Sequence, residues 1–137
     1  MNNFNKLLNE LRSLNLPSSD FAVFGSGPLA IRGIRDVNDV DIIVKPKLWR
    51  ELKEKYEPKN EKLIIVGSIE IYKNWSPWYD NVNELIDEAD NFYGVRFVKL
   101  EKVLNWKELL NRDKDKRDII LIKKFMLIQS KKSIPNK

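Results

Sequence analysis

The sequence predicts an α+β domain in which a small mixed β-sheet is flanked by helices. Two observations carry this prediction. Helical and β-rich segments alternate along the chain, and no repeat, linker or low-complexity tract separates them. Hydrophobic residues make up 42% and charged residues 33% of the 137 residues, without a long apolar run. This balance is typical of one soluble domain with its own core.

The N-terminal part predicts helix, strand and helix in turn. Residues 2–15 form an amphipathic pattern that contains an acidic residue, so we expect a helix, ended by Pro17, rather than a signal peptide. A strand is expected at 21–25. A short helix is expected at 28–34, because Pro28 favours a first helical turn.

The middle of the chain predicts three strands and a helix. An apolar run predicts a strand at 39–44, and a charged helix is expected at 47–56, between Pro46 and Pro58. The segment KLIIVGSIEIYK, residues 62–73, has two β-rich runs around a Gly-Ser pair, which predicts a hairpin or a bulged bend.

The remaining part is predicted to be mainly helical. The segment WSPWYD is expected to be a loop, followed by a short helix at 82–89 and a strand through 94–100. Helices are expected at 101–110 and 114–130. In the loop, Trp75 and Trp78 favour a core edge or a subunit contact over stacking on a nucleotide base.

The chain contains no cysteine and no histidine. Disulfides, thiolate metal sites, His-ligated zinc and Ser-His or Cys-His catalysis are therefore excluded. Chemistry has to use carboxylates, Lys, Arg, Ser or Tyr, with any metal bound through oxygen.

The net charge of +5 is concentrated at the C-terminal end. Residues 112–137 carry nine basic and three acidic side chains, which favours an anionic partner such as nucleotide or nucleic acid. The alternative is a solvated helix face followed by a basic tail. We expect one domain over residues 1–130 and a basic tail over 131–137.

Asp39 and Asp41 lie in or beside the apolar strand at 39–44, where aspartate is unfavourable. Because side chains alternate along a strand, both carboxylates and Ile43 share one face. Two neighbouring carboxylates repel each other and resist burial, and a divalent cation such as Mg²⁺ relieves both problems.

The acid-x-acid spacing alone has little value, because chance gives about three such pairs in a chain of this composition. The pairs present are Glu88/Asp90, Asp113/Asp115 and Asp39/Asp41. Only the last lies in a β-rich run and follows a Gly-Ser turn. The other two are interpreted as solvated helix or loop faces.

The segment before this strand has features of a phosphate site. Gly25 permits a tight turn and a close approach to a ligand, and Ser26 offers a hydroxyl at a helix start. Arg32 and Arg35, three residues apart, are candidates for phosphate contacts from one helix face.

The order Gly-Ser, twelve residues, Asp-Val-Asp-Ile resembles the signature of the DNA polymerase β-like nucleotidyltransferase superfamily. The segment GSGPLAIRGIRDVNDVDI is similar to the minimal and AbiEii-like members, with Leu29 and Arg35 matching their Leu and Arg. The resemblance covers about residues 20–123 and implies a polymerase β palm-like fold. The chain departs from the pattern at Pro28 and Asn38.

The resemblance implies roles for further residues. Glu70 would be the third carboxylate, joining Asp39 and Asp41 from an adjacent strand and sharing their metal. The segment WKELLNRDKDKRDIILI resembles a later motif of the group. It implies that Lys107 contacts the nucleotide phosphates as a fourth catalytic residue. The residues that would shape or charge the edge of the site are Arg112, Lys114, Asp115 and Asp118. Asp118 could equally cap the start of a helix.

The implied activity is transfer of a nucleoside monophosphate from an NTP to a hydroxyl or similar acceptor with two Mg²⁺ ions, for which Mn²⁺ could substitute. Asp39 and Asp41 would hold the metals. Glu70 would ligate the second metal or take the proton of the attacking hydroxyl. Gly25, Ser26 and the arginines would help to bind the triphosphate.

The alternatives stay open at this point. The chain could be an inactive nucleotidyltransferase-like module, an antitoxin or adaptor that binds RNA or a partner protein, although the intact carboxylates argue against it. A purely structural domain ranks last. ATP, CTP, GTP and UTP are equal candidates as substrate, and RNA, protein and small molecules as acceptor. A homodimer or a helical partner protein, no membrane contact and a cytoplasmic location are expected.

Overall fold

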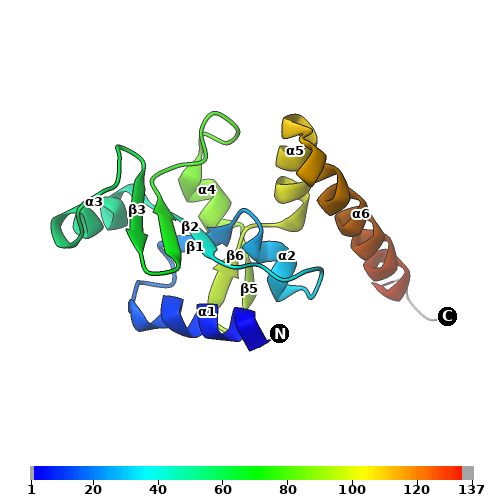
Figure 1. The fold of residues 1–137 in the computed structure, drawn as a ribbon, viewed down its shortest axis with the longest axis horizontal. Coiled ribbons are helices and arrows are strands. Elements are labelled where there is room, and N and C mark those ends of the chain that lie inside the picture. The colour runs from blue at the N-terminus through cyan, green and yellow to red at the C-terminus, as the bar shows by residue number, and fades with distance from the viewer. Residues whose placement is uncertain (1, 134–137) are drawn as a thin grey trace.

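Strands β1 (Phe21–Phe24) and β2 (Val40–Val44) form the centre of the sheet in the computed structural model, which describes residues 2–133 (Figure 1). The described residues form one six-stranded sheet in the order β3-β4-β2-β1-β6-β5. The β2–β4 and β1–β6 pairs are parallel, and the others are antiparallel. The structure is therefore α+β with a mixed sheet and flanking helices, as predicted.

Most of the predicted elements are present, with ends shifted by one to a few residues. The other strands are β3 (Leu63–Val66), β4 (Ile69–Tyr72), β5 (Asp90–Phe92) and β6 (Val95–Phe97). The helices are α1 (Asn2–Ser13), α2 (Gly27–Ile31), α3 (Pro46–Lys55), α4 (Val82–Asp87), α5 (Leu100–Leu110) and α6 (Asp113–Ser133). The Gly67-Ser68 pair joins β3 and β4 as an antiparallel hairpin, one of the two arrangements expected there.

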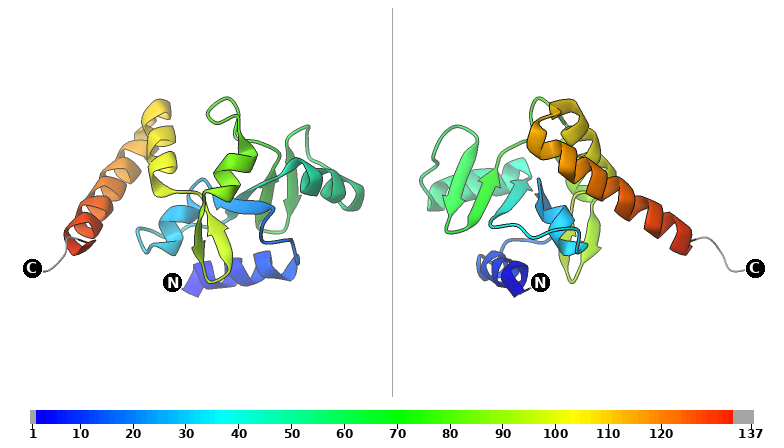
Figure 2. Two further views of the ribbon diagram at one scale, coloured as in Figure 1. Left: turned by 180° about the vertical axis from the view of Figure 1, so that it is seen from behind. Right: turned by 45° about the vertical axis from the view of Figure 1, so that its right-hand side comes forward.

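Two apolar clusters cover the two faces of the sheet. Alternation along β2 sends Val40, Ile42 and Val44 into the cluster that contains α1 and α3, whereas Ile43 packs with α4 and α5 on the other face. The views in Figure 2 show α1 on the opposite side of the sheet from α5. Asp41 alternates with Ile42, so its side chain belongs to the face of α4 and α5.

Helix α6 packs against α5 with its first half and then extends away from the sheet (Figures 1 and 2). The helix continues to Ser133, so the first part of the expected tail at 131–137 is helical. Residues 134–137 lie outside the described residues. No helix among residues 2–133 is both long and apolar enough to cross a membrane.

The strand predicted through 94–100 is present but shorter, as β6, and its partner strand β5 was not predicted. The structure has a hairpin in which β5 pairs antiparallel with the three-residue strand β6. The turn between them uses Tyr93 and Gly94, both with positive φ, as tight hairpin turns require. Strand β5 was missed because Asp90 and Asn91 are poor strand formers and three residues give no measurable alternation.

The helix predicted at 28–34 ends early. Helix α2 stops at Ile31, and Gly33 follows in a left-handed conformation with φ of 75°. The chain turns at this glycine, so Arg32 and Arg35 do not share a helix face. This turn decides which arginine reaches the site described next.

Candidate functional site

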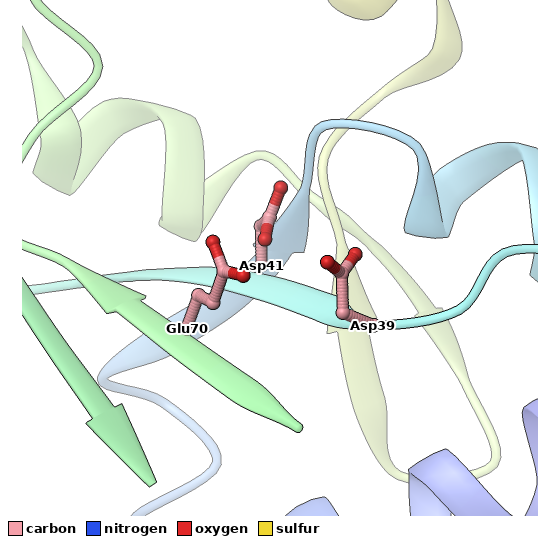
Figure 3. A group of neighbouring side chains, drawn as sticks. All are labelled: Asp39, Asp41 and Glu70. Carbon is pink, nitrogen blue, oxygen red and sulfur yellow. The ribbon is translucent and has the colours of Figure 1, made fainter. Parts of the chain in front are cut away.

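Three carboxylates meet where β2 and β4 lie side by side. Asp39 directly precedes β2, Asp41 lies within it, and Glu70 lies in β4. The parallel pairing places Asp41 opposite Glu70, and ligand oxygens of all three residues lie within 4.8 Å of one another. Figure 3 shows the three side chains on the same side of the two strands. We call these three residues the carboxylate cluster.

The environment of Asp41 disfavours its charged form. Burial raises its pKa to about 7, with further contributions from the charges of Glu70 and Asp39. Burial and the Glu70 carboxylate also raise the pKa of Asp39. The Asp41 Oδ1 atom is buried and has no hydrogen-bond partner among the described residues. A cation bound by this cluster would satisfy that oxygen and neutralise the repulsion.

Tyr72 orients one member of the cluster. Its hydroxyl donates a hydrogen bond of 3.0 Å to Oε1 of Glu70. Burial, followed by the charge of Asp41, raises the pKa of the Tyr72 hydroxyl, so it remains a proton donor at neutral pH. The carboxylate of Glu70 is therefore held in place from its own strand.

Gly25 lies directly against the cluster. Its φ is 67°, and a Cβ atom built on it would lie 2.9 Å from Oδ2 of Asp41. Both the backbone conformation and the space require glycine here. The close approach predicted for this glycine is therefore made to a carboxylate of the chain itself.

Beside the cluster, Arg35 links the Gly-Ser turn to α6. It donates to Asp118 Oδ1 at 2.7 Å and Oδ2 at 2.9 Å, and to Ser26 Oγ at 2.9 Å. Lys107 of α5 approaches Asp118 Oδ2 to 3.0 Å and is only 3% exposed. Burial opposes ionisation of Asp118, but the hydrogen bonds from Arg35 and Lys107 hold its pKa below the ordinary value.

A second acid extends this network. Asp115 is fully buried, accepts hydrogen bonds of 2.6 and 3.0 Å from the Arg112 guanidinium, and lies 3.7 Å from Lys107. Burial works against its charge, but Arg112 and Lys107 lower its pKa. The interpretation of the Asp113/Asp115 pair as solvated is therefore wrong for Asp115. The sequence could not show this, because its burial depends on how α5 packs against α6.

The carboxylate cluster and this network border one hollow of about 690 Å³, which we call the basic hollow. The segment up to the end of β4 contributes Gly25, Ser26, Arg35, Asp41 and Tyr72 to its lining. Helices α5 and α6 and the link between them contribute Trp106, Lys107, Arg112, Lys114, Arg117 and Asp118, among others. The structure thus brings most of the predicted site residues together. Asp39 and Glu70 are not among the lining residues but adjoin Asp41.

The basic residues of this hollow fall into two groups. Arg35, Lys107 and Arg112 are paired with carboxylates. The exposed side chains of Lys114 and Arg117 form no ion pair or hydrogen bond with other residues of the described part. These two cations are the ones available to an incoming anion.

Arg32 is not brought to the site. Its guanidinium donates to Asp90 Oδ2 at 2.9 Å and to the Pro28 carbonyl, and it lies 4.9 Å from the centre of the Phe92 ring. Asp90 also accepts a hydrogen bond of 2.9 Å from Lys99 Nζ, so this partly exposed acid is in addition an ion-pair partner. The expected cap role of Asp118 is not found either, since α6 begins five residues earlier, at Asp113.

Tyr72, Trp106 and Arg117 were not predicted to line the site. Tyr72 follows Glu70 by two residues, so alternation already placed both on one face. The basic run that begins at Arg112 contains Arg117 and was the sequence signal that could have identified it. Trp106 carried no distinguishing signal. Of the loop tryptophans, Trp75 is 4% exposed and belongs to the core as favoured, whereas Trp78 is 36% exposed.

Comparisons with protein-family models, with curated proteins and with solved structures find no match to this chain.

Proposed function

We propose that the chain is a metal-dependent nucleotidyltransferase that moves a nucleoside monophosphate from an NTP to a hydroxyl acceptor. The observation that carries the proposal is the carboxylate cluster at the edge of a basic hollow. The mixed sheet, with Asp41 and Glu70 on parallel neighbouring strands behind a Gly-Ser turn, supports a polymerase β palm-like fold.

The residues of the cluster fit a hard divalent cation. Carboxylate oxygens are the ligands that Mg²⁺ and Mn²⁺ prefer, and the buried Oδ1 of Asp41 has no partner among the described residues. Asp39 and Asp41 would hold the metal, and Glu70 lies beside them. When bound, Mg²⁺ would neutralise the negative charge that develops on the α-phosphate and on the leaving pyrophosphate.

The basic hollow suits the triphosphate. Lys114 and Arg117 would contact its outer phosphates as unpaired cations. Lys107 and Arg35 would act mainly by holding Asp118 and the Ser26 turn in position, because both are already bound to carboxylates. This changes the role proposed for Lys107 from direct contact to positioning.

The reaction balances without a redox partner. The acceptor oxygen forms a bond to the α-phosphorus as the bond from that phosphorus to the bridging oxygen breaks. Pyrophosphate leaves with the electron pair. The hydroxyl proton passes to a carboxylate, which we assign to Glu70 because Tyr72 orients it, and then to solvent.

The test is transfer of label from each of the four α-³²P-labelled NTPs, with and without Mg²⁺, to total RNA, to protein or to a small product. Asp41→Asn should abolish metal-dependent transfer. Asp36→Asn is the matched control, because Asp36 is exposed, near in sequence and outside the cluster. Transfer by Asp41→Asn at the wild-type rate would contradict the proposal. If the wild type neither transfers label nor binds NTP with Mg²⁺, the inactive-module alternative is favoured.

A further inference from the structure

Beside the basic hollow lies a second hollow, of about 320 Å³, that is rich in aromatic side chains. We call it the aromatic hollow. Its aromatic lining residues are Phe24, Tyr72, Trp75, Trp78 and Trp106. Its volume falls in the range of small-molecule sites, roughly 300–1,000 Å³. Trp78 is 36% exposed, more than any other of these side chains, which leaves its ring accessible to a planar ligand.

Two side chains of the aromatic hollow have unused hydrogen-bond donors. The indole N–H groups of Trp75 and Trp106 are buried and have no acceptor within the described part of the chain. Their rings lie 5.1 Å apart, so both donors belong to one small region. Buried donors without acceptors are costly, and a ligand that offers carbonyl or ring-nitrogen acceptors, as nucleobases do, would satisfy them after a small movement.

A third hollow, of about 490 Å³, lies beyond the aromatic one, and we call it the outer hollow. Arg50 and Lys53 of α3 and Lys73, at the end of β4, line it together with one acid, Asp80. The three basic side chains are exposed and form no ion pair with other described residues. This arrangement favours an anion that lies over several cations at once.

Neighbouring hollows adjoin one another through shared lining residues. The outer and aromatic hollows share Asn74. The aromatic and basic hollows share Asp41, Tyr72 and Trp106. Asp41 therefore lies at the boundary between a basic compartment on one side and an aromatic compartment, followed by a second basic one, on the other.

We infer that the aromatic and outer hollows form a binding groove for a single-stranded nucleic acid whose terminal hydroxyl is the acceptor at Asp41. The inference rests on the proposed function, in which the triphosphate occupies the basic hollow. The second reactant then has to reach Asp41 from the aromatic side. A nucleobase there stacks on Trp78, and the phosphates behind it reach Arg50, Lys53 and Lys73.

A protein acceptor fits the groove less well. Aromatic rings next to unpaired cations match the alternation of bases and phosphates in a polynucleotide. A small neutral acceptor would leave the cations of the outer hollow unused. RNA and DNA share the chemistry that the groove recognises, so the experiment separates them.

The experiment measures fluorescence anisotropy with a fluorescein-labelled, 12-nucleotide single-stranded RNA and a DNA of the same sequence. Trp78→Ala should weaken binding roughly 5- to 150-fold, the range for loss of one stacked base. Lys53→Glu/Lys73→Glu should weaken binding and lower the slope of log affinity against log salt by about 1.4, as loss of two phosphate contacts to a single strand predicts.

Matched controls use residues of the same kinds that lie outside the hollows. Tyr93→Ala removes an aromatic ring that is 83% exposed and lies outside all three hollows. Lys47→Glu/Lys55→Glu reverses two charges of α3 that do not line the outer hollow. Both controls should bind nucleic acid like the wild type, and circular dichroism should show that all variants are folded.

Titration of each protein with NTP and Mg²⁺ separates this inference from the proposed function. If the wild type binds NTP but neither RNA nor DNA, the inference is overturned and the proposed function stays intact. The same holds if the Trp78 and Lys53/Lys73 variants bind RNA and DNA as tightly as the wild type. Weaker NTP binding by Trp78→Ala, with nucleic-acid affinity unchanged, would assign the aromatic hollow to the NTP base instead. Label that appears only on protein would likewise overturn the nucleic-acid acceptor.

Discussion

Asp41 carries a charge that its surroundings disfavour. The carboxylate is largely buried in a strand, lies beside two other acids, and has one oxygen without a hydrogen bond in the described structure. A side chain in this position lowers the stability of the metal-free fold whenever it is ionised.

The stability of the metal-free protein should therefore depend on pH through Asp41. Its folded-state pKa, about 7, lies above the ordinary value of 3.8, so its contribution to stability is complete below pH 3.8 and is lost as pH rises through 7. Since one pKa unit corresponds to about 1.4 kcal/mol, the loss amounts to a few kcal/mol at most.

The measurement is the free energy of unfolding in EDTA from pH 5 to pH 8.5. Asp41→Asn should remove this decline and should be more stable than the wild type at pH 8.5. Asp36→Asn, which changes an exposed acid, should follow the wild type. Parallel pH profiles for the wild type and Asp41→Asn would contradict the assignment.

Gly25 lies next to this carboxylate, and its replacement tests the contact. Gly25→Ala should destabilise the fold by roughly 1–3 kcal/mol for the left-handed backbone, and should also displace Asp41 and weaken Mg²⁺ binding. Gly33→Ala is the matched control: it has a φ of 75° with no atom within 4 Å of an added Cβ. Both changes should lower the melting temperature, but only Gly25→Ala should lower Mg²⁺ affinity by calorimetry. Equal Mg²⁺ affinities would show that the contact is unimportant.

At this scale, alternation of side chains was enough to predict that Asp39 and Asp41 share a face. That Glu70 joins them was expected from the resemblance to nucleotidyltransferases, and the three carboxylates do lie together. The pairing of Arg35 with Asp118, 83 positions away, could not be predicted, because it depends on how distant elements pack. The position of Arg32 could not be predicted either, because Gly33, in a left-handed conformation, makes the chain turn between Arg32 and Arg35.

At the scale of elements, α5 and α6 meet through buried ion pairs as well as apolar contacts. Lys107 of α5 is almost fully buried between Asp115 and Asp118 of α6. Such pairs contribute little net stability when complete, but removing one partner leaves uncompensated charge.

Lys107→Met should accordingly destabilise the protein by about 3 kcal/mol, the lower end of the 3–5 kcal/mol range, because Arg35 and Arg112 still pair with the two acids. Lys116→Met is the control. The Lys116 side chain is exposed and pairs only with the exposed Asp113, so this change should alter the free energy of unfolding by no more than about 0.5 kcal/mol. Chemical denaturation of both variants gives the comparison. Equal stabilities would mean that the buried network does not hold the two helices together.

Element length decided what could be predicted. The long helices and the apolar strands have enough residues for periodicity to be read, and all were predicted near their observed positions. Strand β5 has three residues, two of them Asp and Asn, and its hairpin exists because β6 pairs with it. Local preference does not determine such a strand.

At the scale of the molecule, the mixed sheet separates a mainly apolar packing layer from a face that carries the carboxylate cluster. Helices α1 and α3 cover one side, while the carboxylates open toward the side of α4 and α5. Alternating helical and β-rich segments predicted this class of fold. The three adjoining hollows were not predictable, because their walls come from segments throughout the chain that only the folded structure brings together.

The four tryptophans give the groove an optical consequence. Trp49 lines the outer hollow, and Trp75, Trp78 and Trp106 line the aromatic hollow. Tryptophan fluorescence of the unmodified protein therefore comes entirely from indoles that border the groove, and a base stacked on Trp78 would quench the part that comes from Trp78. The Trp75 and Trp106 rings, 5.1 Å apart at 69°, are close enough to couple their excited states, so near-ultraviolet circular dichroism would report any rearrangement beside Asp41 without a label.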